Sequence, residues 1–580
     1  MCRRILLFVL MLWCVRAEAG FVPEQPIMPV RDLRPNMTGY ILTVLKGTEP
    51  ERLPIKIVSI APQKPGRELS DEIIIRFTGR HKLAQGMSGS PVYVQGKLIG
   101  AVRSGWDMSD QTLACVAPIE SMCRVFDEEA SQKSLTPTPY SLTSNLYISG
   151  LNPSNSSLLA LGRTLGLTFT QGVSLSAQDL TVSPYRFRPG DAVSAMFVWG
   201  DIEAGAVGTI TATSKDGRFL AFGHPVNKAG KVSYPAAKTY IHEVVNSLQF
   251  PFKLASPASI NGVFTHDREA GAGGRSGLYP PSIGAEFRFK NLDTGAQSSY
   301  RFRVIADEFM SRELLVKVFT ALAEEAWGSK GQGTMMVNLH IDGKAIPDGW
   351  SRRDIFYSDE DILEKAFEQA EHIIDAYLTQ PFEETMPSGF VMTVEATQKP
   401  RVLLIEDVKL SKETAKPGES ITVTVKLRGW RTAPIERKFT MKIPADANDG
   451  VCMLVVRGGS VESSEQISVD EGWKSIDSLG RMLTEFKAAD ANNELILELY
   501  ADRTGEIINA VLDQLAEKGK KDKKTKKDEK PAEPDSGLLP EEEEYLSETK
   551  ARYIEEGTMR VFSSEYFIDG MMKRLIHVEK

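Results

Sequence analysis

The chain has 580 residues, of which 42% are hydrophobic and 25% are charged, with a formal net charge of −8. This length exceeds what one hydrophobic core can organise and predicts roughly three to five domains in an otherwise ordinary globular composition. The modest negative charge, without a basic stripe in the segments predicted to fold, argues against a nucleic-acid partner.

The N-terminus has the features of an export signal. Arg3 and Arg4 precede an apolar run at residues 5–15, and Ala17 and Ala19 provide small residues at the spacing that signal peptidase requires. The run is too short for a bilayer of about 30 Å, although a retained anchor is the alternative. We therefore predict a signal peptide at 1–19 and export to the periplasm or cell envelope, with no stable transmembrane anchor after cleavage.

Two β-rich blocks follow, at residues 20–140 and 141–300. Alternating or β-branched runs predict strands at 40–45, 55–60, 73–77, 91–94 and 98–102, and again at 192–199, 208–212 and 219–222. Asp216 and Gly217 lie between the last two runs and predict a hairpin turn.

The pattern changes after residue 300. Helical spacing predicts helices at 312–327 and 359–378, with a strand at 333–341 between them, so that 301–395 forms an α+β segment. Apolar and polar residues alternate in short runs within 396–512, which predicts an Ig-like β-sandwich with an appended helix and strand. Lysine-rich and glutamate-rich runs predict a charged, disordered linker at 513–548, and 549–580 is set apart as a C-terminal tail.

Cysteine and metal chemistry receive little support. After signal cleavage only Cys115, Cys123 and Cys452 remain, without a disulfide framework or metal-ligand spacing. Buried thiols are favoured over a Cys115–Cys123 pair. No phosphate-binding or zinc motif occurs, so no cofactor and no metal are predicted.

The most informative motif is Gly86-Met87-Ser88-Gly89-Ser90-Pro91, which precedes a predicted hairpin. A nucleophilic serine needs an exposed hydroxyl on a tight turn and nearby N–H groups for an oxyanion, and glycines permit such a turn. Ser88 is therefore the candidate nucleophile, with the backbone of Gly86, Met87 and Ser88 as the oxyanion hole. A glycine-rich turn without chemistry is the alternative.

A base is sought among the seven histidines. His224 lies between Gly223 and Pro225 at the end of a predicted strand, where the turn presents its imidazole. His266, which precedes Asp267, ranks second. Since a lone histidine is usually structural, neither assignment rests on the local sequence alone.

The serine motif and the Gly223-His224-Pro225 turn together resemble the SpoIVB peptidase family of chymotrypsin-like serine endopeptidases. The resemblance covers roughly residues 30–300 and includes Gly208-Thr209-Ile210-Thr211 before the histidine turn. It implies that Ser88 is the nucleophile, that His224 is the catalytic histidine, and that 20–140 and 141–300 are the serine-side and histidine-side halves of a double β-barrel.

Two departures from the family pattern accompany this resemblance. The serine half precedes the histidine half, as in an exported bacterial subgroup with a SpoIVB peptidase domain, whereas founding members have the opposite order. The triad acid is also absent from its usual place before the serine motif. The substitutes are Asp71, Glu72, Asp107 and Asp201, of which Asp201 is preferred.

The sequence thus predicts a mainly β, multidomain protein with a chymotrypsin-like double barrel in swapped order, an α+β segment and a C-terminal Ig-like sandwich. Its predicted function is an exported serine endopeptidase acting on protein or peptide substrates of the envelope. The alternative is an inactive protease-fold scaffold that binds envelope proteins or cell-wall components. Nothing in the sequence indicates an oligomeric state.

Overall fold

The structure is a computed structural model that describes residues 20–62, 71–106, 108–127, 145–165, 168–174, 180–247, 251–307, 310–328, 331–461, 476–501 and 546–580. The protein is mainly β, as predicted. The predicted signal peptide, Asp107 and nearly all of the predicted linker lie outside the described residues. Unit 1 comprises residues 1–154, 158–282 and 302–307, and unit 2 comprises 155–157, 283–301 and 308–580. Each unit is described separately.

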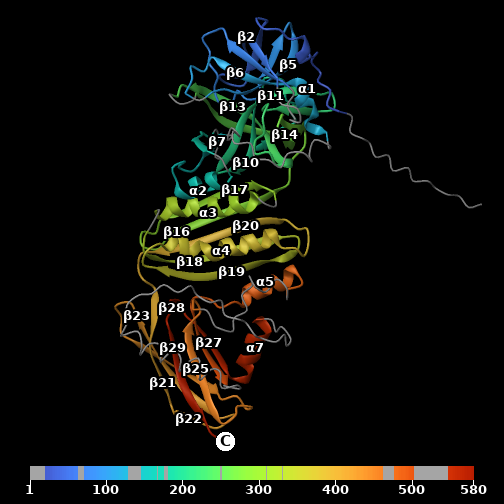
Figure 1. Cartoon of the computed structure of the whole chain (residues 1–580). Coiled ribbons are helices and arrows are strands. Elements are labelled where there is room, and N and C mark those ends of the chain that lie inside the picture. The colour runs from blue at the N-terminus through green and yellow to red at the C-terminus, as the bar shows by residue number, and fades with distance from the viewer. Residues whose placement is uncertain are drawn as a thin grey trace, which may run out of the picture. The chain divides into compact units, whose positions relative to one another are not determined.

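The first part of unit 1 is a closed barrel with the strand order β1-β2-β3-β6-β5-β4 (Figure 1). Its elements are η1 (Val30–Asp32), β1 (Thr38–Thr43), β2 (Glu51–Ala61), β3 (Glu72–Phe77), β4 (Pro91–Val94), β5 (Lys97–Ser104), β6 (Leu113–Pro118), α1 (Ile119–Cys123) and η2 (Arg124–Phe126). Alternate residues of β2 and β3, such as Ile55, Ile57, Ile73 and Ile75, point into one buried core. All five strands predicted in this block are confirmed.

The second part of unit 1 contains a ring of six strands. Strand β10 pairs with β11 and β13, and β12, β15 and β14 complete the circuit. The elements are β7 (Asn145–Ser149), α2 (Ser156–Leu165), β8 (Thr168–Gln171), β9 (Thr181–Val182), β10 (Ala192–Gly200), β11 (Glu203–Thr213), β12 (Arg218–Ala221), β13 (Gly230–Val245), β14 (Phe252–Arg268) and β15 (Gly271–Ser276). The predicted hairpin is confirmed, because β11 pairs antiparallel with β12 and Gly217 has a φ of 87°.

Unit 2 begins with an α+β arrangement. It contains β16 (Ser282–Asn291), part of β17 (Gln297–Ile305), α3 (Met310–Trp327), β18 (Gly333–Gly343), β19 (Ile346–Ser358), α4 (Ile362–Thr379) and β20 (Pro387–Thr397). The strands pair in the order β19-β18-β20-β16, while α4 contacts β18 and β19 and α3 contacts α4. Asp361 accepts hydrogen bonds from the backbone N–H groups of Leu363 and Glu364, so the side chain of Asp361 caps the start of α4.

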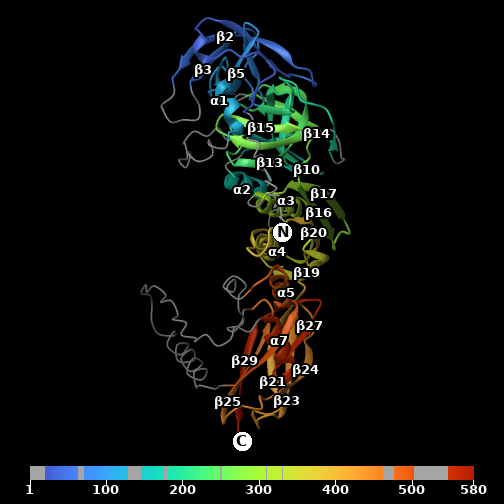
Figure 2. The ribbon, with the colours of Figure 1, turned by 90° about the vertical axis from the view of Figure 1, so that its right-hand side faces the viewer.

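The remainder of unit 2 is a pair of sheets around one core, which Figure 2 shows from the side. One sheet has the order β24-β23-β21-β28 and the other the order β22-β29-β25-β26-β27. The elements are β21 (Val402–Leu410), β22 (Thr414–Ala415), β23 (Ser420–Gly429), β24 (Ile435–Lys442), β25 (Gly450–Gly458), α5 (Leu479–Ala488), β26 (Glu494–Ala501), α7 (Leu546–Glu556), β27 (Met559–Ser563), β28 (Phe567–Asp569) and β29 (Met571–Val578).

The C-terminal residues are part of this core. Residues 549–580 were predicted from the sequence to be a tail. They instead form most of α7 and all of β27, β28 and β29. Strand β29 pairs antiparallel with β25 and parallel with β22, and Ile576 and Val578 are buried in the shared core. The tail interpretation is therefore corrected, because partners far along the chain supply the pairing that these short runs lack locally.

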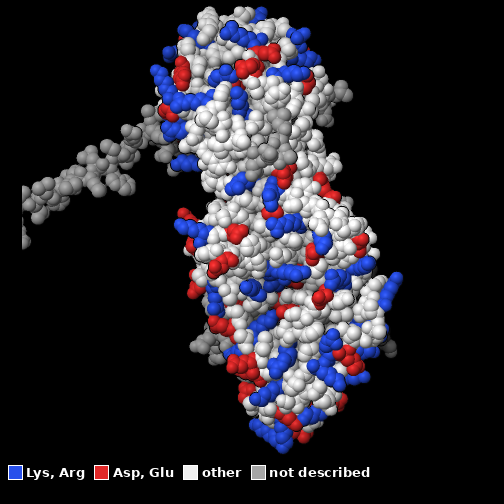
Figure 3. Space-filling view, turned by 180° about the vertical axis from the view of Figure 1, so that it is seen from behind, with Lys and Arg blue, Asp and Glu red and all other residues white. Residues whose placement is uncertain are grey.

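Two surface properties bear on partners. Among the described residues, no helix has both the length and the apolar character to cross a membrane. Figure 3 shows Lys and Arg side chains interspersed with Asp and Glu side chains over much of the visible face. Such a mixture gives this face no extended field of one sign.

Candidate active site

The candidate nucleophile lies in a short loop before β4, which we call the nucleophile loop (residues 84–90). Gly86 and Gly89 have φ values of 87° and 88°, in the left-handed region that favours glycine. The Met87 N–H donates to the Ala84 carbonyl oxygen at 3.0 Å, and the Ser90 N–H donates to that of Met87 at 2.9 Å. These tight turns leave Ser88 partly exposed while Ser90 is fully buried.

The nucleophile loop is attached to the second ring of unit 1. The Thr209 N–H donates to the Ser88 carbonyl oxygen at 2.8 Å, and the Thr209 hydroxyl donates to the Gly86 carbonyl oxygen at 3.0 Å. The Thr211 hydroxyl donates to the Gly89 carbonyl oxygen at 2.7 Å. These bonds explain why both threonines of Gly208-Thr209-Ile210-Thr211 are fully buried: they hold the loop by its main chain.

Gly89 is required by close packing as well as by its backbone angle. A Cβ at this position would lie 2.1 Å from the Thr209 carbonyl oxygen and 2.4 Å from the Phe222 nitrogen. No side chain fits at those distances without movement of the backbone. The loop of the first barrel thus lies directly against β11 and the end of β12.

Two backbone donors of the nucleophile loop are unused. In the described part of the chain, the N–H groups of Gly86 and Ser88 donate to no protein acceptor, whereas the Met87 N–H is engaged by Ala84. Of the three residues predicted for the oxyanion hole, Gly86 and Ser88 therefore have N–H groups available for a substrate oxygen.

His224 lies in the turn that follows β12. Phe222 and Gly223 have φ values of 67° and 66°, and a Cβ on Gly223 would lie 2.9 Å from the Val102 carbonyl oxygen of β5. His224 is only 9% exposed, and its Nδ1 lies 2.7 Å from the Pro225 carbonyl oxygen. Because that oxygen can only accept, Nδ1 carries the proton and Nε2 retains a lone pair.

Burial keeps this imidazole neutral. Loss of solvation lowers the pKa of His224 to about 4, and the nearby positive charge of Arg103 acts in the same direction. The Pro225 carbonyl and the charge of Glu269 partly oppose this shift. At neutral pH His224 is therefore an uncharged acceptor of protons.

The expected triad acid does not contact His224. Asp201 lies exposed in the turn between β10 and β11, and the Nδ1 position that an acid would occupy is taken by Pro225. The carboxylate whose charge acts on His224 is Glu269, which forms ion pairs with Arg103 at 2.6 Å and Lys228 at 3.0 Å. Of the other substitutes, Asp71 and Glu72 precede or begin β3, and Asp107 is outside the described residues.

Ser88 and His224 lie in segments that share neighbours, but no hydrogen bond joins them in the described structure. The main chain of Ser88 is bonded to Thr209, and Thr209 in turn accepts a 3.4 Å bond from the Phe222 N–H, two residues before His224. Hydrogen bonds between a nucleophile and its base are often long without substrate and tighten when substrate binds.

Asp267 organises the loop that follows His224, and sequence reasoning missed it. Its buried carboxylate accepts N–H groups from Val226 at 2.7 Å, Asn227 at 2.8 Å and Ala229 at 3.4 Å. Burial raises the pKa of Asp267, and these donors oppose that shift by favouring the carboxylate. The sequence signal for Asp267 is its place directly after His266, the second candidate base.

We expect Asp267→Asn to loosen this loop. Asparagine presents one acceptor oxygen and an NH₂ group to backbone donors, so at least one buried N–H loses its partner at a cost of about 1–3 kcal/mol. Amide hydrogen exchange should become faster in peptides covering residues 224–230. Asp216→Asn is the control, because Asp216 also accepts a backbone N–H but has a side chain 41% exposed. Equal exchange in both variants would contradict the assigned role.

The second candidate base and the two neighbouring cysteines lie in structural surroundings. His266 lies 2.9 Å from the Thr265 hydroxyl through Nδ1, and its ring contacts Phe126 edge-on. Burial raises the pKa of the Cys115 and Cys123 thiols to about 12, which makes both poor nucleophiles. Across the described ranges, no group of three His, Cys, Asp or Glu side chains is arranged to hold a metal ion.

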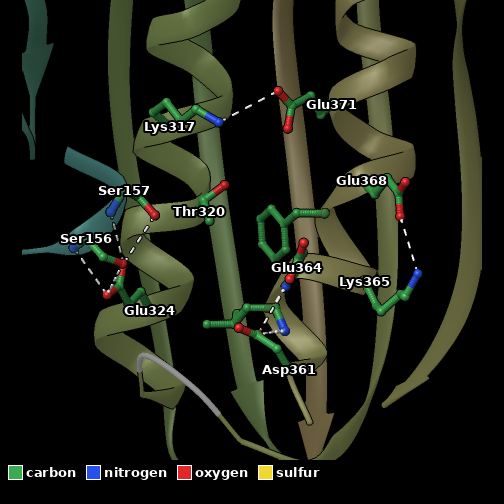
Figure 4. A pocket seen from close by; sticks show the side chains of 12 residues that line it. Ser156, Ser157, Lys317, Thr320, Glu324, Asp361, Glu364, Lys365, Glu368 and Glu371 are labelled. Atoms are coloured by element: carbon green, nitrogen blue, oxygen red, sulfur yellow. Dashed lines mark hydrogen bonds and ion pairs between the residues drawn. The ribbon is translucent and has the colours of Figure 1, made fainter. Parts of the chain in front are cut away.

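Unit 2 contains an open pocket of about 450 Å³ beside α3 and α4 (Figure 4). Three of its five acidic side chains have structural roles. Glu324 accepts hydrogen bonds from Ser156 and Ser157, and Glu371 lies 3.7 Å from Lys317. Asp361 is the cap of α4 described above. These contacts assign those three carboxylates to helix caps and ion pairs.

Comparison of this chain with protein-family models, with curated proteins and with solved structures gave no match.

Proposed function

We propose that this chain is a serine endopeptidase of the SpoIVB type, with Ser88 as nucleophile and His224 as base. One observation carries the proposal: the partly exposed Ser88 and Gly86, two residues before it, both have unused N–H groups in a loop packed against the turn of His224. Acyl transfer by serine requires a nucleophile, a base and oxyanion donors. The closed barrel and the ring of six strands in unit 1 support a chymotrypsin-like double barrel in swapped order.

The proposed reaction uses only groups of this chain. Ser88 Oγ attacks the peptide carbonyl carbon while its proton passes to Nε2 of His224, and the new oxyanion accepts the N–H groups of Gly86 and Ser88. The carbon–nitrogen bond then breaks, His224 returns the proton to the leaving amine, and an ester to Ser88 remains. Water attacks this ester along the same proton path and releases the carboxylic acid.

The Pro225 carbonyl performs the orienting role that a triad acid usually has. It fixes the tautomer of His224, but a neutral carbonyl stabilises the imidazolium less than a carboxylate does. Loss of the acid in a classical triad costs about 10⁴ in turnover. We therefore expect slow turnover, with acylation easier to detect than steady cleavage.

The proposal extends to the rest of the chain. Export to the periplasm or envelope follows from the signal peptide predicted at residues 1–19. The two C-terminal sheets with their shared core support an Ig-like module, which is suited to contacts with envelope proteins or cell-wall components.

A non-catalytic scaffold is the second candidate function. It is favoured by the absence of a carboxylate partner for His224 among the described residues. In that case unit 1 would retain its strands and loops as a binding surface only. A covalent probe of the serine separates the two functions.

The test is labelling of the folded protein with a fluorophosphonate, with the modified residue located by mass spectrometry. We expect modification of Ser88, its complete loss in Ser88→Ala, and strong reduction in His224→Ala, because phosphonylation needs the same nucleophile and base. Ser90→Ala is the matched control, since Ser90 is buried with its hydroxyl 3.4 Å from that of Thr209. A folded protein that is not labelled would instead support the scaffold.

A further inference from the structure

A lysine without a counter-charge is buried beside the nucleophile loop. Lys253, near the start of β14, is only 5% exposed, and its ammonium nitrogen Nζ lies 2.8 Å from the Thr43 hydroxyl of β1. It forms no ion pair in the described structure. An interior cation normally has a carboxylate partner, because its desolvation costs several kcal/mol. Lys253 is therefore outside the usual pattern of structural lysines.

The side chain of Lys253 supports the residue that starts the proposed oxyanion hole. A Cβ on Gly86 would lie 3.1 Å from Cδ of Lys253 and 3.3 Å from its Cβ and Cγ. The Lys253 N–H donates to the Gln85 carbonyl oxygen at 3.0 Å, and the Gln85 N–H donates to that of Pro251 at 2.8 Å. The methylene chain of Lys253 thus packs against the backbone at Gly86, two residues before Ser88.

The elements around Lys253 offer it no charged partner. Lys46, which follows β1, pairs at 3.2 Å with Glu243 of β13, and both side chains are more than half exposed. The nucleophile loop itself has no ionisable side chain. Burial alone lowers the pKa of Lys253 to about 7. Both the neutral amine and the charged ammonium form of Lys253 are therefore populated near neutral pH.

We propose that Lys253 is a positioning residue for the nucleophile loop, whose neutral form holds the Gly86 and Ser88 N–H groups toward substrate and whose charged form displaces them. The proposal rests on the serine peptidase function given above. An ammonium has three donors, but the described residues offer Nζ one acceptor, the Thr43 hydroxyl. Protonation therefore draws water or a main-chain carbonyl toward Nζ beside Thr43, and the methylenes that pack against Gly86 move with it.

The test compares the pH dependence of fluorophosphonate labelling between pH 5 and 9 in the wild type and in Lys253→Met. Methionine keeps the length of the side chain but cannot be protonated. The wild-type rate should fall as pH decreases through about 7, whereas His224, with a pKa of about 4, stays neutral over nearly all of this range. In Lys253→Met the rate should stay nearly constant over this range, so the ratio of the rate at pH 6 to the rate at pH 8.5 should be about tenfold higher in the variant than in the wild type. Lys253→Arg, charged throughout, should label slowly at every pH.

Lys46→Met is the matched control, because Lys46 is exposed and its replacement should leave the wild-type profile unchanged. Parallel profiles for the wild type and Lys253→Met would overturn the proposal. A readout independent of activity is hydrogen exchange of peptides covering residues 84–90, compared at each pH. Exchange should be faster in the wild type than in Lys253→Met at pH 6 and equal at pH 8.5. If this difference appears without any labelling, the peptidase function fails while the loop switch stands, and equal exchange at both pH values refutes the switch.

Discussion

Deletion of residues 571–580 is expected to unfold the pair of sheets formed by β21–β29. Strand β29 lies between β22 and β25, and it pairs with β25 along eight consecutive positions. Its removal leaves one edge of β25 unpaired and withdraws Ile576 and Val578 from a shared core. Loss of one large buried aliphatic side chain typically costs 2–5 kcal/mol, and here several such losses add to the missing hydrogen bonds.

Calorimetry and limited proteolysis should reveal this loss as one missing transition and rapid cleavage within 402–501. Leu575→Ser provides a control on the same strand, because Leu575 is 45% exposed and its substitution should change stability by less than about 0.5 kcal/mol. A deletion variant that retains every transition of the full chain would show that β29 is dispensable.

Lys253→Met is expected to stabilise unit 1 by about 3–5 kcal/mol at pH 6. In the unfolded chain this lysine keeps its proton up to a pKa near 10.5, whereas burial lowers the folded pKa to about 7. Each pKa unit between these two values corresponds to 1.36 kcal/mol. About 1 kcal/mol for the lost hydrogen bond to Thr43 is subtracted from the total. Methionine removes the desolvation cost and fills a similar volume.

The sign of the pH dependence follows from these two values. Below pH 7 the lysine is protonated in both states, so the folded wild type bears the full cost of the buried charge. Between pH 7 and 10.5 the unfolded state binds more protons, and the stability of the wild type therefore rises with pH. The advantage of Lys253→Met should be largest below pH 7 and should vanish near pH 10.5.

Urea unfolding of unit 1 at pH 6, 7.5 and 9, followed by hydrogen exchange of its peptides, measures this effect. Lys46→Met should stay within about 0.5 kcal/mol of the wild type, because its ion pair with Glu243 is exposed. If Lys253→Met is less stable than the wild type at pH 6, the lysine is solvated in a way that its burial does not indicate.

Strands with regular alternation were predicted well from the sequence. The predicted strand 91–94 coincides with β4, and the predicted helix 359–378 matches α4 apart from its first residues, where Asp361 caps it. The paired strands β13 and β14 were not predicted as such. They contain Pro235 and Pro257, which normally indicate the end or the edge of a strand. Register shifts also interrupt the alternation of apolar and polar residues, so the pattern does not predict two long strands.

The local parts of the candidate site were also accessible from sequence. Glycines at 86 and 89 predicted the turn at Ser88, and Gly223 and Pro225 predicted the turn at His224. The contacts that hold these two turns in place could not be predicted from the sequence. Thr209 bonds to the backbone of Gly86 and Asp267 to that of Val226, and both partners lie far away in the sequence. Lys253 was not predicted for a similar reason. Burial of a cation is a property of the folded chain, and the residues next to Lys253 in the sequence do not indicate it.

The position of β29 also determines when the C-terminal sheets can form during synthesis. As the chain emerges from the ribosome or a translocation channel, β22 and β25 appear long before the strand that must lie between them. Until residue 578 has emerged, β25 has an unpaired edge whose alternating apolar residues are open to other chains. Such late, distant pairing slows folding, so a holding chaperone would be needed longest for this part of the protein.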